Sequence, residues 1–322
     1  MPNPTQQLSV IEKIGYSLGD LAANLIFQTL MTFIAFFYTD VYKIPAGTAS
    51  IIIFVGGFVG AFFNILMGAI ADRTITKWGK FRPWILWTSI PFGIISLLAF
   101  STPNFSEEGK VIYAFITYFL LVIVYSANNL PYSALSGVLT GDMKERNSLS
   151  SYRFVAVMIA QFIIQSLLLP LTLSLGHGDK AAGFEKTMFF FAIAGVICFI
   201  ITFLTTKERI IPPKEQKNPF KQDLNDLFKN KPWIIMLLLT ISVFITLALK
   251  GGMYIYYFKY YLNEGALSSF LENIGFNKFI MGLNKTVTGL GLGEFQWPKD
   301  AATSANSLFN AGGIIFMIIG IL

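Results

Sequence analysis

Four polar side chains lie at four-residue intervals in an otherwise apolar stretch near the N-terminus. Tyr16, Asp20, Asn24 and Gln28 share one face of a helix, because residues four apart are neighbours on its surface. The surrounding run, residues 14–39, is long enough to cross about 30 Å of hydrocarbon. A carboxylate facing lipid there costs about 2.5–3.5 kcal/mol. We therefore expect Asp20 to face protein or water, with this helix as one wall of a polar path.

Two later apolar runs carry similar polar faces. Helical spacing places four residues of the run 111–139 on one face: Tyr125, Asn128, Asn129 and Tyr132. In the run 232–262 the same geometry groups Lys250, Tyr254, Tyr257 and Tyr261. Any one of these faces is equally well explained by hydrogen bonds between helices. Three such faces, two of them charged, favour a shared polar cavity.

The side chains of these faces indicate the kind of ligand. Amide and carboxylate oxygens accept hydrogen bonds from hydroxyl groups, and aromatic rings stack on C–H faces, so a sugar or glycoside is expected. A strongly anionic substrate needs more cations than Lys250 and Arg153. The sequence shows no base–nucleophile pair and no cluster of metal ligands, so we expect neither an enzyme nor a cofactor or metal site. The single histidine, His177, lies in a Gly-rich loop.

The elements that must position these residues are membrane helices. Of the 322 residues, 54% are hydrophobic and only 13% are charged, against about 25% charged in soluble proteins. Eight apolar runs predict an all-α membrane protein: 14–39, 47–71, 83–101, 111–139, 152–176, 187–205, 232–262 and 302–322. The net charge of +6 is concentrated in alternate loops, which favours a lipid bilayer rather than nucleic acid as the partner.

The distribution of basic residues predicts the topology. Lys and Arg gather after the second, fourth and sixth runs, so these loops and the N-terminus are expected in the cytoplasm. We expect a six-helix N-terminal half over 1–205, a cytoplasmic linker over 206–231 and a partial C-terminal half over 232–322. An extracytoplasmic loop, 263–300, contains a segment with helical apolar spacing, 266–285. The sequence stops within an apolar run, so we expect a fragment of a longer protein.

The second run ends in a charged loop that could act as an inner gate. Its glycines recur every four residues with Asn64, which suits close helix packing. The loop that follows carries the residues expected to form the gate: Asp72, Arg73, Lys80 and Arg82. We expect Asp72 to pair with a neighbouring arginine, a contact that breaks when the two halves rock.

Several motifs together resemble one family. GAIADRTITKWGKFRPW, GYSLGD and NLPYSALSGVLTGDMKERNSLSSYR resemble the glycoside–pentoside–hexuronide:cation symporters, the melibiose-permease-like branch of the major facilitator superfamily. The resemblance covers the first six runs and fades after about residue 262. It implies a helical bundle of twelve helices in two halves, alternating access, and a sugar site lined by helices 1, 4, 7 and 10.

The resemblance also implies roles for individual residues. Family sugar contacts correspond to Asp20, Asn129 and Arg153. Sodium-coupled members carry aspartates where this chain has Gly60, Asn64 and Asn129, so the negative charge that offsets a dehydrated cation is missing. A sugar-stacking aromatic residue of the family falls at Ser133, beside Tyr132.

We therefore expect a secondary active transporter of a sugar or glycoside in the bacterial inner membrane, coupled to H⁺ rather than Na⁺. The expected substrate contacts are Tyr16, Asp20, Asn24, Asn128, Asn129, Tyr132, Arg153, Lys250 and Tyr254. Cation coupling is expected at Asp20 and Asn64. Two alternatives stay open: an uncoupled sugar facilitator, and a membrane scaffold or sensor that transports nothing.

Overall fold

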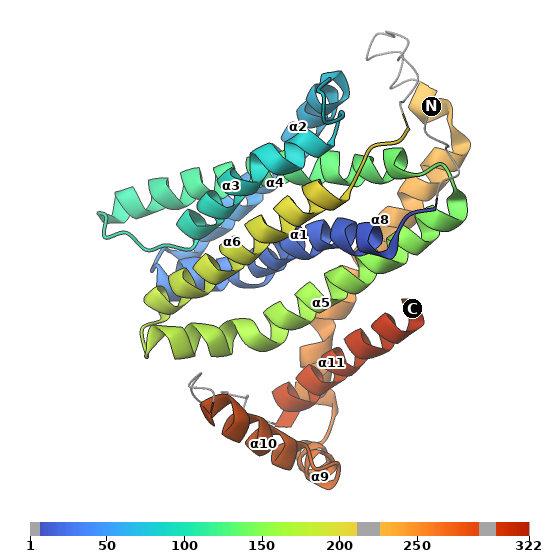
Figure 1. Ribbon diagram of the computed structural model, residues 1–322. Coiled ribbons are helices and arrows are strands. Elements are labelled where there is room, and N and C mark those ends of the chain that lie inside the picture. The colour runs from blue at the N-terminus through green and yellow to red at the C-terminus, as the bar shows by residue number, and fades with distance from the viewer. Residues whose placement is uncertain (1–6, 211–225, 290–300, 322) are drawn as a thin grey trace. The chain divides into compact units, whose positions relative to one another are not determined.

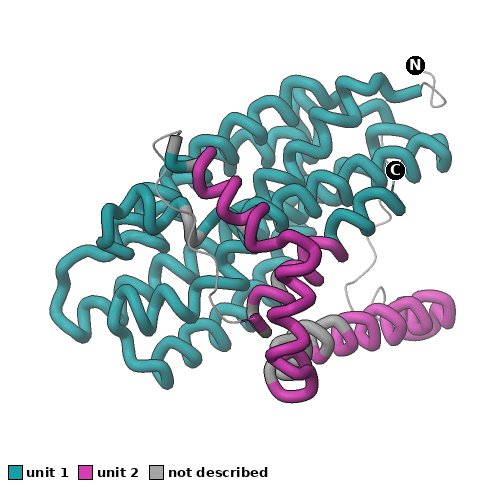
Figure 2. Tube along the Cα trace, turned by 90° about the horizontal axis from the view of Figure 1, so that it is seen from below, with its two compact units in different colours: residues 1–211, 288–294, 314–322 teal, residues 212–287, 295–313 magenta. Residues whose placement is uncertain are grey.

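The computed structural model describes residues 7–210, 226–289 and 301–321. These residues are largely helical and form no β-strand. The chain divides into two compact units (Figure 2). One comprises Met1–Ile211 with Thr288–Glu294 and Ile314–Leu322, and the other comprises Pro212–Val287 with Phe295–Gly313.

The first unit contains six long helices (Figure 1). They are α1 (Val10–Phe36), α2 (Ala46–Arg73), α3 (Arg82–Ala99), α4 (Glu107–Leu139), α5 (Met143–Gly176) and α6 (Lys180–Thr205). In the described part of the chain, six helical spans are long and apolar enough to cross a membrane, one in each of these helices. The predicted all-α membrane fold is confirmed.

Short polar side chains fix where four of these helices begin. Each accepts a hydrogen bond from a backbone N–H in the first turn, which has no partner within the helix; the caps are Ser9, Ser106, Asp142 and Asp179. The Asp142 cap explains why α5 starts at Met143 and not at the predicted residue 152. The helix thus begins with polar sequence that hydropathy alone did not assign to it.

Helix α1 occupies the centre of the first unit. It packs along α5 and α6, while α3 packs on α4 and α6, and α2 packs on α4. Its two inward glycines seat side chains of the neighbouring helices: Gly15 lies against Thr205, and Gly19 against Tyr132. Because these contacts leave no room for a Cβ atom, α1 is held close to α4 and α6.

A π-helical turn, η1 (Phe37–Val41), ends α1. The Tyr42 backbone N–H donates to the Phe37 carbonyl at 2.8 Å, one residue further back than in an α-helix. The turn points the Phe37 ring into an aromatic cluster, with its centroid 5.1 Å from Phe100 and 5.4 Å from Phe184. This cluster closes the end of the bundle opposite the charged loops.

The second unit contains the remaining described helices. They are α8 (Lys231–Tyr256), η2 (Tyr257–Tyr261), α9 (Glu264–Asn273), α10 (Phe276–Gly289) and the part of α11 (Ala301–Ile321) up to Gly313. The two predicted late spans are therefore helices, α8 and α11, whose described apolar portions are Lys231–Thr246 and Leu308–Ile321. The helical segment predicted over 266–285 is two helices, α9 and α10.

Removing the central ring of the aromatic cluster should destabilise the bundle. Phe37 is fully buried, so Phe37→Ala leaves a cavity and should cost about 3 kcal/mol of unfolding free energy. The matched control is Phe54→Ala on α2, because Phe54 is 68% exposed. Thermal unfolding in detergent should show a clear loss for Phe37→Ala and a small one for Phe54→Ala. Equal losses would show that the cluster does not stabilise the fold.

Candidate functional site

An ion pair lies inside the first unit, between α1 and α5. The Arg153 Nε–H donates to the Asp20 carboxylate at 2.5 Å. The Asp20 side chain is 7% exposed and that of Arg153 is 26% exposed. Burial of either charge alone is costly, and a hydrogen-bonded partner offsets that cost. Asp20 therefore faces protein, and Arg153 is the more accessible partner.

Two tyrosines lie next to this pair. The Tyr16 hydroxyl donates to the Tyr132 carbonyl at 2.9 Å, and the Tyr132 hydroxyl donates to the Tyr16 carbonyl at 2.7 Å. Their rings stack with centroids 4.6 Å apart and planes inclined by 12°. The Arg153 guanidinium lies 5.3 Å from the centroid of Tyr132 and 5.6 Å from that of Tyr16. Four of the predicted site residues, from α1, α4 and α5, thus meet at one place.

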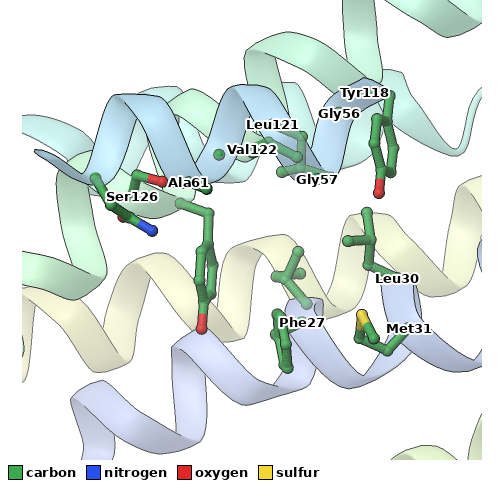
Figure 3. A pocket seen from close by; sticks show the side chains of 14 residues that line it. Phe27, Leu30, Met31, Gly56, Gly57, Ala61, Tyr118, Leu121, Val122 and Ser126 are labelled. Atoms are coloured by element: carbon green, nitrogen blue, oxygen red, sulfur yellow. The ribbon is translucent and has the colours of Figure 1, made fainter. Parts of the chain in front are cut away.

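A cavity of about 330 Å³ lies between α1, α2 and α4 (Figure 3). Its wall is mostly apolar, with Phe27 from α1 stacked on Tyr125 from α4 at 5.1 Å. Asn64 and Ser126 add polar groups, and none of the residues lining this cavity is a carboxylate. Phe27 and Tyr125 are each seven residues, about two helical turns, from Asp20 and Tyr132 respectively, so the cavity lies further along the same two helices.

Two other residues predicted to contact the substrate, Asn24 and Asn128, form hydrogen bonds within the bundle. The Asn24 side chain donates to the Asp20 carbonyl of its own helix at 2.9 Å. Asn128, only 1% exposed, donates to the Thr88 hydroxyl of α3 at 2.8 Å, away from the face that carries Tyr132. Its carbonyl oxygen is buried without a protein partner in the described structure. Asn129 is half-buried on α4.

Two predicted contacts belong to the second unit. Lys250 and Tyr254 lie within α8, but their side chains fall outside the part of the chain that the structure describes. Their roles remain predictions.

The predicted gate residues form a compact loop between α2 and α3. Asp72 pairs with Lys80 at 2.9 Å, so the expectation that it pairs with an arginine is wrong. The chain reverses at Gly79, and this brings Lys80 back to the end of α2. Arg82 instead donates to the Phe203 carbonyl at the end of α6 at 2.6 Å. Arg73 is exposed at the end of α2.

Glu208, a residue that sequence analysis did not single out, holds this loop. Its carboxylate accepts from the backbone N–H groups of Lys80, Phe81 and Arg82 at 2.8–2.9 Å. These are donors at the start of α3, where an anion is stabilised. Gly79 adopts a φ of +116°, and a Cβ atom there would collide with the Glu208 carboxylate. The only feature of the sequence that could have indicated this role of Glu208 is its position shortly after a membrane-spanning run.

The same end of the bundle contains two further ion pairs. Arg209 donates to both Glu12 oxygens at 2.6 and 2.7 Å, and this hydrogen bonding raises the pKa of Arg209. Lys13 pairs with Glu145 at 2.9 Å. These contacts join the start of α1 to the first turn of α5 and to the segment after α6. The segments predicted to share one side of the membrane therefore meet at one end of the first unit.

Six helices of membrane-spanning length packed around a buried ion pair define a multi-pass membrane protein. The sequence matches the family described as MFS/sugar transport protein over residues 15–319, and the chain belongs to this family. The family predicted from the loop motifs is thereby confirmed.

Named relatives are similar over most of the chain. It is 41% identical over 253 residues to the inner membrane symporter YicJ and 39% identical over 263 residues to the putative glycoside/cation symporter YagG, both of Escherichia coli K12. It is 35% identical over 278 residues to the isoprimeverose transporter of Lactiplantibacillus pentosus. These matches cover 79%, 82% and 83% of the chain, but 55%, 57% and 58% of the relatives. The chain thus spans little more than half the length of these proteins.

Neutralising Glu208 should loosen the α2–α3 loop. In Glu208→Gln, one carboxylate oxygen is replaced by an NH₂ group that faces backbone donors, so we expect a loss of about 2 kcal/mol in unfolding free energy. Glu107→Gln is the control, because the Glu107 side chain is 77% exposed and should change stability by less than about 0.5 kcal/mol. Thermal unfolding compares the two variants. A Glu208→Gln protein as stable as the control would contradict the capping role.

Proposed function

We propose that this chain is part of a secondary active transporter that moves a sugar or glycoside by alternating access. In this proposal, residues 1–205 form the six-helix N-terminal half, 206–231 the cytoplasmic linker and 232–322 the beginning of the second half. The positions of the long helices and their family membership support this division. The names of the relatives support the substrate class, since one is a putative glycoside/cation symporter and another an isoprimeverose transporter.

The observation that carries the proposal is the ion pair between Asp20 and Arg153. A charged pair within membrane-spanning helices is retained at a cost and marks a solute or ion pathway. Because the charges cancel, the pair offers hydrogen-bonding groups without net charge, which suits a neutral polyhydroxylated solute. Asp20 and Arg153 are proposed as principal substrate contacts, with Asn129 of α4 as a further contact.

The coupling ion is proposed to be a proton taken up at Asp20. The cavity beside Asn64 has no carboxylate in its lining, and a dehydrated sodium ion needs negative charge nearby. The same observation favours a second candidate function, an uncoupled sugar facilitator. The two are separated by whether sugar can be accumulated against its gradient.

The membrane is proposed to be the bacterial inner membrane, with the N-terminus in the cytoplasm. One end of the first unit brings together the α2–α3 loop, the start of α5 and the segment after α6, and each of these carries Lys or Arg residues. Basic loops stay on the cytoplasmic side. The names of the relatives are consistent with this location, since one is an inner membrane symporter.

Asp20→Asn should abolish accumulation of sugar by the full-length protein. Proteoliposomes would be given isoprimeverose, methyl β-D-xyloside and a matching glucuronide under an imposed H⁺ or Na⁺ gradient. We expect accumulation of the neutral sugars driven by the H⁺ gradient, and none in Asp20→Asn, because an amide cannot take up the coupling proton and leaves Arg153 without its anionic partner. Asp40→Asn is the control, because Asp40 is exposed at the end of the same helical span.

Three results would change the proposal. Uptake driven by a Na⁺ gradient alone would show that the coupling ion is Na⁺. Equilibration of sugar across the membrane without accumulation would show that the protein is an uncoupled facilitator. No exchange of any of these sugars, together with no sugar-induced shift in thermal unfolding, would favour a scaffold or sensor.

A further inference from the structure

Tyr16 and Tyr132 form a closed unit inside the bundle. Each hydroxyl donates to the backbone carbonyl of the other residue, and the two rings are stacked. Both residues are 0% exposed. In this conformation the hydroxyls are therefore occupied and out of reach of a solute. We refer to the two residues as the tyrosine platform.

The platform lies against a charged group of the site. The Arg153 guanidinium carbon is 5.3 Å and 5.6 Å from the two ring centroids, within the range of cation–π attraction, which strengthens when water is excluded. Arg153 comes from α5, whereas the rings come from α1 and α4. The guanidinium therefore contacts the platform in addition to Asp20.

The hydrogen bonding of Arg153 leaves part of the guanidinium unused. Its Nε–H binds Asp20, and neither Nη group has a hydrogen-bond acceptor among the residues that the structure describes. The Arg153 side chain is 26% exposed, while that of Asp20 is 7% exposed. The donors open to a hydroxyl group are thus on the Nη side of Arg153.

We propose that Tyr16 and Tyr132 are positioning residues that hold Arg153 with its Nε–H on Asp20 and its Nη groups turned toward the substrate. The proposal rests on the proposed function and adds a role that differs from the direct contact expected of these tyrosines. The tyrosine platform requires a glycine at position 19, because a Cβ atom on Gly19 would overlap the Tyr132 ring. The ring can reach Arg153 only while this position on α1 stays bare.

A purely structural role for the platform makes a different prediction. If the tyrosines only fasten α1 to α4, their loss lowers the amount of folded protein and leaves the substrate affinity of the folded fraction unchanged. If they position Arg153, loss of the ring weakens binding, and restoring a ring without its hydroxyl restores binding. A fall in Vmax at constant KM therefore indicates a purely structural role, whereas a rise in KM at constant Vmax per folded transporter indicates a positioning role.

The first test measures isoprimeverose uptake by the full-length protein in proteoliposomes. Tyr132→Leu should raise KM about tenfold with Vmax per folded transporter nearly unchanged, whereas Tyr132→Phe keeps the ring and should stay within about threefold. Tyr38→Leu is the control, since Tyr38 is also buried and also donates to a carbonyl of α4, that of Ala114. An unchanged KM in Tyr132→Leu would overturn the proposal.

A second test does not depend on transport. The coupling between Asp20→Asn and Arg153→Gln is measured by thermal unfolding as a double-mutant cycle, with and without Tyr132→Leu. We expect the coupling to fall by about half or more when the ring is absent. If the coupling energy between Asp20 and Arg153 is unchanged in Tyr132→Leu, the positioning role of the tyrosine platform is wrong even if the protein transports sugar. Absence of isoprimeverose uptake by the unsubstituted protein counts against the proposed function but leaves this test intact.

Gly19→Ala serves as a second variant in case Tyr132→Leu does not fold. The added methyl group should displace the Tyr132 ring and raise KM in the same direction. Gly47→Ala is its control, because Gly47 is exposed in the first turn of α2, outside the cavity, and a Cβ atom there has no neighbour within 4 Å. Equal KM values for the two alanine variants would also overturn the proposal.

Discussion

The cost of placing charge within hydrocarbon governs the arrangement of the first unit. Asp20 lies on a helix that is otherwise suited to lipid, so it requires a cation or water. Arg153 supplies the cation from α5, and that single contact fixes which face of α1 points inward. The apolar side chains on the remaining faces of the helices can then meet lipid without further polar partners.

The ion pairs at one end of the bundle contribute to holding the six helices together. Six helices that pack through apolar and small side chains gain little from the hydrophobic effect within a membrane, because lipid is as apolar as their surfaces. Ion pairs and caps outside the hydrocarbon add defined contacts. Glu208 on the start of α3, and Arg209 on Glu12, connect the segment after α6 to α1 and α3. The segment after α6 is thus anchored to the first unit.

Helical spacing predicted part of the site and misplaced another part. It grouped Tyr132 with Asn128 on α4, since residues four apart share a face. In the structure Tyr132 reaches Tyr16 on α1, whereas Asn128 turns to Thr88 on α3. A helical face is wide enough to touch two neighbours, and spacing does not say which neighbour receives each side chain. Arg153 was expected only from the family resemblance, because its own segment has no comparable polar face.

The sequence by itself determined the membrane class, the six long spans, the family and the need for Asp20 to face inward. These follow from local quantities: the length of apolar runs, the charge of loops and the energy of a carboxylate in lipid. Only the tertiary structure decided that Asp20 meets Arg153, that two tyrosines exchange hydrogen bonds, and that Glu208 caps α3. Those contacts join residues more than a hundred positions apart. They depend on how helices pack side by side, which no local pattern encodes.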